Sequence, residues 1–177
     1  MKKILFLVTA LLFSVGIAKA QDIYFAGHSM PDTLGNVSAS VWKNNTLIYN
    51  WFDTNAIPTV NDMYVSENGD VYCAGFTTDT LNEATGTVWK NGEVFLTVGQ
   101  RSVFNKMIVK GEDIITAGYI RDANGQCHAT IWQNGELLYT PSDTLAYSAI
   151  NAIAMDEEGN IYSAGYVPYP SNTFTKL

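Results

Sequence analysis

The stretch Asn61–Gly75 reads NDMYVSENGDVYCAG, and variants of it occur twice more along the chain. The second copy is NKMIVKGEDIITAG over Asn105–Gly118, and the third is NAIAMDEEGNIYSAG over Asn151–Gly165. Each copy has two segments of alternating apolar and polar residues around a turn that contains glycine, which predicts a β-hairpin. The second half alone, DIYFAG, stands at Asp22–Gly27. A repeat of this kind is the strongest guide to architecture that the sequence offers.

A second repeated unit follows the first at an almost constant distance. It reads SASVWKNNTLIYNW over Ser38–Trp51, TGTVWKNGEVFLTV over Thr85–Val98 and HATIWQNGELLYTP over His128–Pro141. Its centre is Asn-Gly in two copies, the favoured two-residue hairpin turn, and Asn44-Asn45 in the other, where asparagine tolerates the same left-handed angles. The spacing from the glycine that ends the first unit to the tryptophan of the second is 15, 14 and 14 residues. Two hairpins per period predict four antiparallel strands.

These residues resemble a known repeat family. The stretch NAIAMDEEGNIYSAGY over Asn151–Tyr166 looks like the bacterial β-propeller repeat called SBBP and, more loosely, the NHL repeat. The hairpin VWKNG at Val88–Gly92 is similar to one found in secreted repeat proteins of the Bacteroidetes type. The resemblance covers nearly all of residues 22–170. It implies a scaffold, and such scaffolds share no common activity.

We therefore expect an all-β, β-propeller-like array of four-stranded blades, because a period of 43 to 48 residues is the size of one blade. A repeat domain at 21–177 would comprise blade parts at 22–59, 60–103, 104–149 and 150–177. The first part would lack its opening strand, two would be complete, and the last would hold two strands, with no helix after Ala20. A β-sandwich or a β-solenoid is the alternative fold.

Two complete and two partial blades are too few for a closed ring, so the expected ring is open or incomplete. The sequence ends just before the next VWKNG hairpin would begin, which favours a fragment of a longer protein. An open arc would expose apolar surface at both ends. Self-association of such a fragment is therefore expected.

Residues 1–20 predict a secretory signal peptide. The basic Lys2 and Lys3 precede an apolar run from Ile4 to about Ile17, which is followed by Ala18-Lys19-Ala20. The run is too short for a transmembrane anchor to be the better interpretation. The expected location is the periplasm, the cell surface or the medium, without membrane insertion once the leader is removed.

The remaining 157 residues are acidic, with a net charge of −10 and no cluster of lysine or arginine. Such a surface repels phosphate backbones and anionic headgroups. Nucleic acid and membrane surfaces are therefore poor candidates as partners. A protein or a glycan remains the expected kind of partner.

Three asparagines, Asn61, Asn105 and Asn151, recur where the first strand of each unit begins. The resemblance implies that this strand lies nearest the propeller axis, where an amide could face a ligand. The favoured interpretation is that each asparagine holds its own loop by bonding nearby backbone. Both roles remain open at this point.

Three tryptophans, Trp42, Trp89 and Trp132, occupy one position just before the second turn. A blade has both faces buried against its neighbours, so these rings are expected to be the repeated core. Each indole N–H would find a hydrogen-bond partner there. An exposed row for stacking sugars is the alternative.

No catalytic, cofactor or metal motif is recognisable. The acidic turns at 66–70 and 156–160 lack the ligand pattern of a calcium loop, and His28 and His128 have no neighbours at ligand spacing. Cys73 and Cys127 show no metal spacing, and a disulfide between them is left open. The unrepeated acids form no recognisable acid/base pair; they are Asp53, Glu83, Asp122 and Asp143.

Three threonines lie in Asp-Thr-Leu triplets that resemble the O-glycosylation motif of exported Bacteroidetes proteins. These candidates are Thr33, Thr80 and Thr144. The first two share a repeat position, which also favours a simple turn sequence. The N-glycosylation sequons at Asn36 and Asn44 matter only in a host with that pathway.

The favoured function is an exported, non-catalytic β-propeller scaffold that binds protein or glycan through its loops. The alternative is a carbohydrate-active enzyme, a glycosidase or lyase, whose catalytic acids lie in loops or in a part of the protein absent from this sequence. Such an enzyme needs two converging carboxylates. A purely structural role is the third hypothesis.

Overall fold

The computed structural model describes residues 21–29, 37–140 and 147–166, which form thirteen strands and no helix. The first sheet contains β1 (Tyr24–Ser29), β2 (Ser38–Lys43) and β3 (Thr46–Trp51). The second contains β4 (Ala56–Val65), β5 (Val71–Asp79), β6 (Ala84–Lys90) and β7 (Glu93–Gln100). The third contains β8 (Ser102–Lys110), β9 (Asp113–Arg121), β10 (Cys127–Gln133) and β11 (Glu136–Tyr139), and the fourth contains β12 (Ala149–Met155) and β13 (Ile161–Tyr166).

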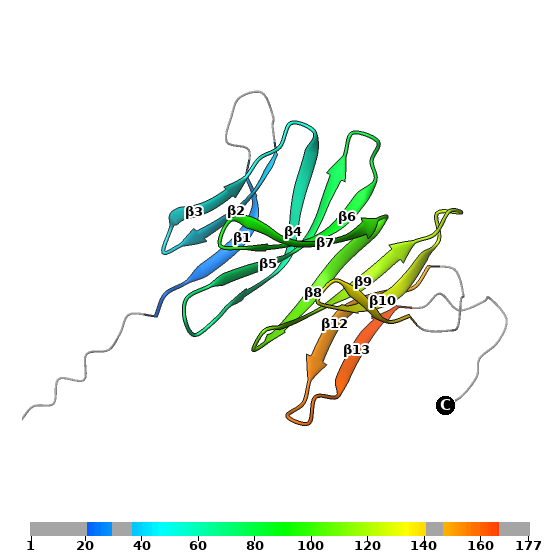
Figure 1. Cartoon of the computed structure of the whole chain (residues 1–177). Helices are drawn as coiled ribbons and strands as arrows, with labels where there is room; N and C mark the ends of the chain where they lie inside the picture. Colours follow the sequence, from blue (N-terminus) through cyan, green and yellow to red (C-terminus); the bar gives the residue numbers. More distant parts are fainter. Residues whose placement is uncertain (1–20, 30–36, 141–146, 167–177) are drawn as a thin grey trace, which may run out of the picture.

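The expected all-β class is confirmed, and the strands group into sheets of three, four, four and two as the hairpin units indicate. Every sheet is antiparallel, and within a sheet each strand after the first pairs with the one before it in the chain. Figure 1 shows the four sheets following one another in chain order, from the blue and cyan first sheet to the orange fourth. Local hairpins therefore build each sheet.

The turns between the last two strands of the first three sheets have the expected backbone. Both residues have positive φ at Asn44-Asn45 (48° and 65°), Asn91-Gly92 (50° and 90°) and Asn134-Gly135 (52° and 84°). Positive φ at both central residues defines the type I′ turn, which matches the right-handed twist of the flanking strands. These asparagines and glycines thus determine where each hairpin reverses.

The opening strands are longer than the sequence indicated, because β4, β8 and β12 begin before the repeated asparagine. Each contains a β-bulge at Asn61, Asn105 or Asn151, where the pairing register shifts by one residue. The strand continues through the bulge, so the expected part boundaries at 60, 104 and 150 fall inside it. A bulge bends the strand and leaves the extra residue out of the pairing.

A glycine lies opposite each bulge. A Cβ added to Gly75 would lie 1.9 Å from the carbonyl oxygen of Thr59, and Gly118 and Gly165 have the same relation to Val103 and Ala149. No side chain fits at that distance. The repeated Ala-Gly pair is therefore required by the close approach of the opening strand.

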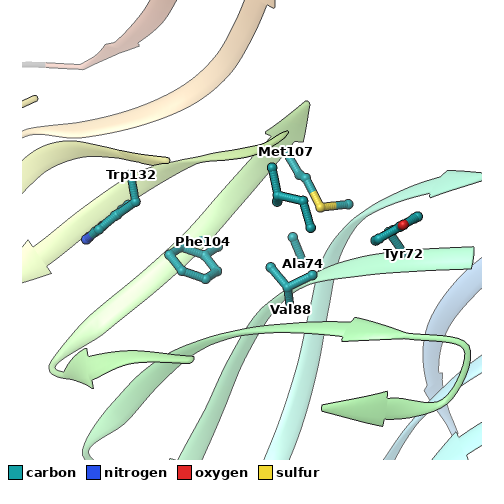
Figure 2. Packing of buried hydrophobic residues seen from close by; sticks show 7 residues of the cluster. Tyr72, Ala74, Val88, Phe104, Met107 and Trp132 are labelled. Carbon is teal, nitrogen blue, oxygen red and sulfur yellow. The ribbon is translucent and has the colours of Figure 1, made fainter. Parts of the chain in front are cut away.

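The sheets stack face to face and bury three apolar clusters. Between the second and third sheets, Tyr72, Ala74 and Val88 meet Phe104, Met107, Ile114 and Trp132. Figure 2 shows these side chains converging from the two sheets, and the rings of Phe104 and Trp132 meet edge to face at 5.1 Å. The other clusters lie between the first and second sheets and between the third and fourth. Both faces of the two middle sheets are thus occupied by packing.

Candidate functional site

The bulged asparagines form one polar row, here called the asparagine edge (Asn61, Asn105 and Asn151), along the opening strands of three successive sheets. The Nδ2 of Asn61 donates to the carbonyl oxygen of Phe104 at 2.8 Å, and that of Asn105 donates to Ile150 at 2.8 Å. Each accepting residue immediately precedes the asparagine of the next sheet. The asparagines therefore join neighbouring sheets, whereas the sequence favoured a bond within each residue's own loop.

Beside the asparagine edge, a side chain of the second sheet makes a further hydrogen bond to the third sheet. Asp62 accepts the backbone N–H of Met107 through Oδ2 at 2.9 Å, and its Oδ1 lies 3.4 Å from the ammonium of Lys106. Asn105 also donates to Oδ1 of Asn151 at 3.3 Å. Polar groups at this edge thus hold the stacked sheets in register.

The asparagine edge also remains accessible, because Asn61 and Asn151 are exposed and Asn105 is half-buried. A primary amide has two N–H donors and an acceptor oxygen, so a single inter-sheet bond leaves capacity for a further partner. The structure therefore places the three residues in a row where inter-sheet bonding and contact with a polar ligand are compatible.

A second polar group, which we call the loop cluster (Glu83, Arg101, Asp122 and His128), lies at the loop before β10 and beside the start of β8. The Nε2 of His128 lies 3.2 Å from Oδ2 of Asp122. Arg101 pairs with Glu83 at 3.3 Å and donates to the carbonyl oxygen of Asp122 at 3.3 Å. No acid pair was recognisable in the sequence, and the contact between Asp122 and His128 was missed.

The chemistry of Asp122 is that of an ionised carboxylate. The backbone N–H of Gln126 bonds its Oδ1 at 2.9 Å, and this bond, with the one from His128, holds the pKa of Asp122 below its usual range. A carboxylate that accepts several hydrogen bonds favours its charged form. The six-residue separation of Asp122 and His128, across one hairpin loop, is the signal that could have revealed the pair.

A third polar feature repeats at the opposite ends of the strands. Three turn asparagines each accept the backbone N–H of a residue at or next to the start of the unit's second strand, and each donates from Nδ2 to the aspartate just before that residue. They are Asn44, Asn91 and Asn134. These aspartates are Asp22, Asp70 and Asp113, and hydrogen bonding holds the pKa of each below its usual range. We call these pairs the Asp–Asn clamps; they tie one hairpin of a sheet to the next.

The three repeated tryptophans differ in burial. Trp89 and Trp132 are 2% and 4% exposed, and each packs against the preceding sheet. Trp42 belongs to the first sheet and is half-buried, with its ring stacked on Phe25 at 4.8 Å between centroids. An exposed row of all three rings for stacking sugars is therefore wrong.

Of the three candidate modification sites, only Thr80 lies within the described residues; Thr33 and Thr144 lie outside them, as does Asp143. Thr80 is exposed in the turn after β5, and Oδ1 of Asp79 accepts the N–H of Leu81 and of Glu83, both within 3.0 Å. Asp79 therefore shapes the loop that presents Thr80.

Cys73 and Cys127 are both free and buried, in different sheets. Burial raises the pKa of the Cys73 thiol to about 12, so this thiol is protonated at neutral pH. Within the described residues no three His, Cys, Asp or Glu side chains gather in a way that could hold a metal ion. The same residues include no helix of the length and apolar character that a membrane span requires.

Comparison with known proteins yields no relative: no family model matches the chain, and no curated protein or solved structure matches it either. The residues themselves therefore carry every functional argument.

Proposed function

We propose that this chain forms an exported, propeller-like scaffold without catalytic activity that binds a protein or a glycan. The observation that carries this proposal is the asparagine edge. Stacking occupies both faces of the middle sheets, so recognition is left to edges and loops, and Asn61, Asn105 and Asn151 form a repeated polar row with exposed members at such an edge.

A propeller arrangement accounts for several features together. The complete sheets have four antiparallel strands in chain order, and successive sheets stack face to face. The opening strands β4, β8 and β12 contact one another in sequence and are joined by the asparagine bonds. In a propeller, radial repetition would bring such strands together around a central channel. The signal peptide that the sequence predicts at residues 1–20 supports export, and the resemblance to SBBP repeats supports a bacterial surface or secreted protein.

The loop cluster is the feature that would favour an enzyme, and its charge state argues against a glycosidase. Such an enzyme needs one carboxyl group that stays protonated near neutral pH, with a raised pKa, as the general acid. The pKa of Asp122 is instead lowered, and Glu83 is paired with Arg101. The scaffold is therefore the better proposal.

The test is a glycan array and a pull-down from the exoproteome of the native host, using the purified full chain. We expect a ligand whose affinity falls at least tenfold in Asn151→Ala. Asn68→Ala is the matched control, because Asn68 is also exposed but lies in the turn between β4 and β5. Absence of any ligand, or equal loss in both variants, would contradict a role for the asparagine edge.

We also propose that Thr80 carries an O-linked glycan in the native host. Asp79 fixes the shape of the turn, and Thr80 is exposed in it, so an enzyme can reach the hydroxyl. Intact mass of the chain from that host should show added hexose that is lost in Thr80→Ala. A mass without any added sugar would contradict the proposal.

A further inference from the structure

β1, the first strand of the first sheet, has an open edge. β5, β9 and β13 each pair with an opening strand on one side, namely β4, β8 and β12. β1 occupies the same repeat position and pairs with β2, but no described strand pairs with its other side. An open edge leaves backbone N–H and C=O groups available for another strand.

Gly27 indicates that the open edge of β1 is suited to a neighbouring strand that approaches closely. At Gly75, Gly118 and Gly165 a Cβ would lie 1.9 Å from a carbonyl oxygen of the opening strand. Gly27 stands in the same Ala-Gly pair, yet no atom of the described residues lies within 4 Å of the position of its Cβ. No contact in the described structure therefore requires glycine at position 27. A bulged strand that approached β1 as closely as β4 approaches β5 would require it.

Apolar side chains of this segment are also uncovered. Ile23 and Phe25 are 67% and 44% exposed, whereas the equivalent residues in β5, Val71 and Cys73, are 3% and 1% exposed. Ile23 and Phe25 lie on the face of the first sheet that no described sheet covers, so their exposure concerns that face and not the edge. The Nε2 of His28 lies 3.5 Å from Oγ1 of Thr59, so the edge of β1 runs beside β4. A strand added there would lie against β4, as β4 lies against β8.

We propose that the open edge of β1 is a binding site for an extended segment of another polypeptide with the pattern apolar–Asn–any–apolar. The three occupants of the equivalent positions have this pattern: Val60-Asn61-Asp62-Met63, Phe104-Asn105-Lys106-Met107 and Ile150-Asn151-Ala152-Ile153. The segment would pair antiparallel to β1 with a bulge at its asparagine. Binding by strand addition takes affinity from backbone hydrogen bonds and specificity from the surroundings of alternate side chains of the added strand.

The repeated bonds also identify what the asparagine of the segment would contact. Asn61 donates to the carbonyl of Phe104, and Asn105 donates to that of Ile150, in each case the residue before the next asparagine. The corresponding carbonyl for a segment on β1 is that of Val60. This site is distinct from the scaffold function proposed above and does not depend on it, because it involves β1 and not the exposed amides.

The probe is a fluorescent peptide with the sequence of β8, SVFNKMIVK, titrated against the purified full chain by anisotropy. We expect saturable one-to-one binding that weakens at least tenfold in Gly27→Ala, because the added methyl group occupies the space into which the bulge carbonyl must fit. The urea midpoint of Gly27→Ala should be equal to that of the wild type or slightly higher, since the methyl meets no described residue. Hydrogen exchange should slow at Tyr24–Ser29 when the peptide binds.

Gly99→Ala is the matched control, because a Cβ at Gly99 in β7 also has nothing within 4 Å; this variant should bind as the wild type does. A peptide with its asparagine changed to alanine should bind more weakly, and a scrambled peptide of the same charge should not bind. Absence of saturable binding to the wild type, equal binding to Gly27→Ala, or equal binding of the scrambled peptide would each overturn the proposal. None of these results would bear on the ligand of the asparagine edge.

Discussion

The first and second sheets carry the same repeated residues, but only the second is enclosed. β5 lies between β4 and β6, and both faces of its sheet pack against neighbours. β1 has one paired edge, and its sheet is packed on one face. As a result Cys73 is 1% exposed and its counterpart Phe25 is 44% exposed. A repeated residue thus acquires its energetic role from the neighbouring sheet, and equivalence in sequence is not equivalence in stability.

The largest expected effect comes from the tryptophan pair. Trp89→Ala should lower the free energy of unfolding by about 4 kcal/mol, because it leaves a large cavity between the first two sheets. Trp42→Ala should cost less than about half as much, since the half-buried Trp42 ring packs mainly on Phe25. Urea denaturation followed by far-UV circular dichroism gives both values. Equal losses would mean that Trp42 is enclosed in solution.

The glycine pair should give the next largest contrast. Gly75→Ala places a methyl carbon against the carbonyl of Thr59, which forces β4 and β5 apart and should cost about 3 kcal/mol. Gly27→Ala should change the free energy of unfolding by less than about 1 kcal/mol, with a slight gain favoured by the stiffer unfolded chain. The same urea titrations measure both variants. A large loss in Gly27→Ala would show that β1 already has a strand at its open edge.

The third sheet extends the comparison to a buried hydroxyl. Thr116 occupies the position of Cys73 and is 1% exposed, and its Oγ1 has no hydrogen-bond partner among the described residues. Thr116→Val should therefore stabilise the chain by about 1 kcal/mol, because an unpaired polar group is replaced by a methyl of similar shape. The matched control is Thr130→Val, which should destabilise by about 1 kcal/mol. Thr130 is also buried, but its Oγ1 donates to the carbonyl of His128 at 2.8 Å. Thermal melts of the two variants should shift in opposite directions.

The features that the sequence could predict are the local ones. Asn91-Gly92 and Asn134-Gly135 carry the backbone angles that make a hairpin reverse, so the strands and their grouping could be read from the chain. The role of Asn61 could not, because its partner, the carbonyl of Phe104, is 43 residues away in another sheet. A glycine pattern indicates a turn or a close approach without saying which strand approaches.

The same limit applies to the candidate site. Asp122 and His128 are close in sequence, yet their contact depends on how the loop between β9 and β10 closes, with Asp122 accepting the N–H of Asn124 and Gln126. The inter-sheet bond from Asp62 to Met107 requires the stacking of two sheets. Aligning the repeats with one another shows which residues recur, but it does not show the bonds that join one repeat to the next.

The smallest expected effect concerns the Asp–Asn clamps, for which the first and second sheets should behave alike. Asp22 and Asp70 each accept Nδ2 of a turn asparagine within their own sheet, at 2.8 and 2.7 Å, and each pairs with a lysine, Lys43 or Lys90. The pKa of both carboxyl groups is lowered, for Asp22 chiefly by Lys43 and for Asp70 chiefly by Asn91.

A carboxyl group whose pKa is lower in the folded state stabilises the fold above its unfolded pKa, and this contribution disappears as the pH falls through the folded value. Stability should therefore decline below about pH 4, and Asp70→Asn should make that decline shallower. Asp22→Asn should do so to the same small extent, because the Asp–Asn clamps are contained within single sheets and both lie at the surface. Urea midpoints between about pH 2 and pH 6 measure the slopes. If Asp70→Asn flattened the acid limb and Asp22→Asn did not, the clamps too would depend on enclosure by a neighbouring sheet.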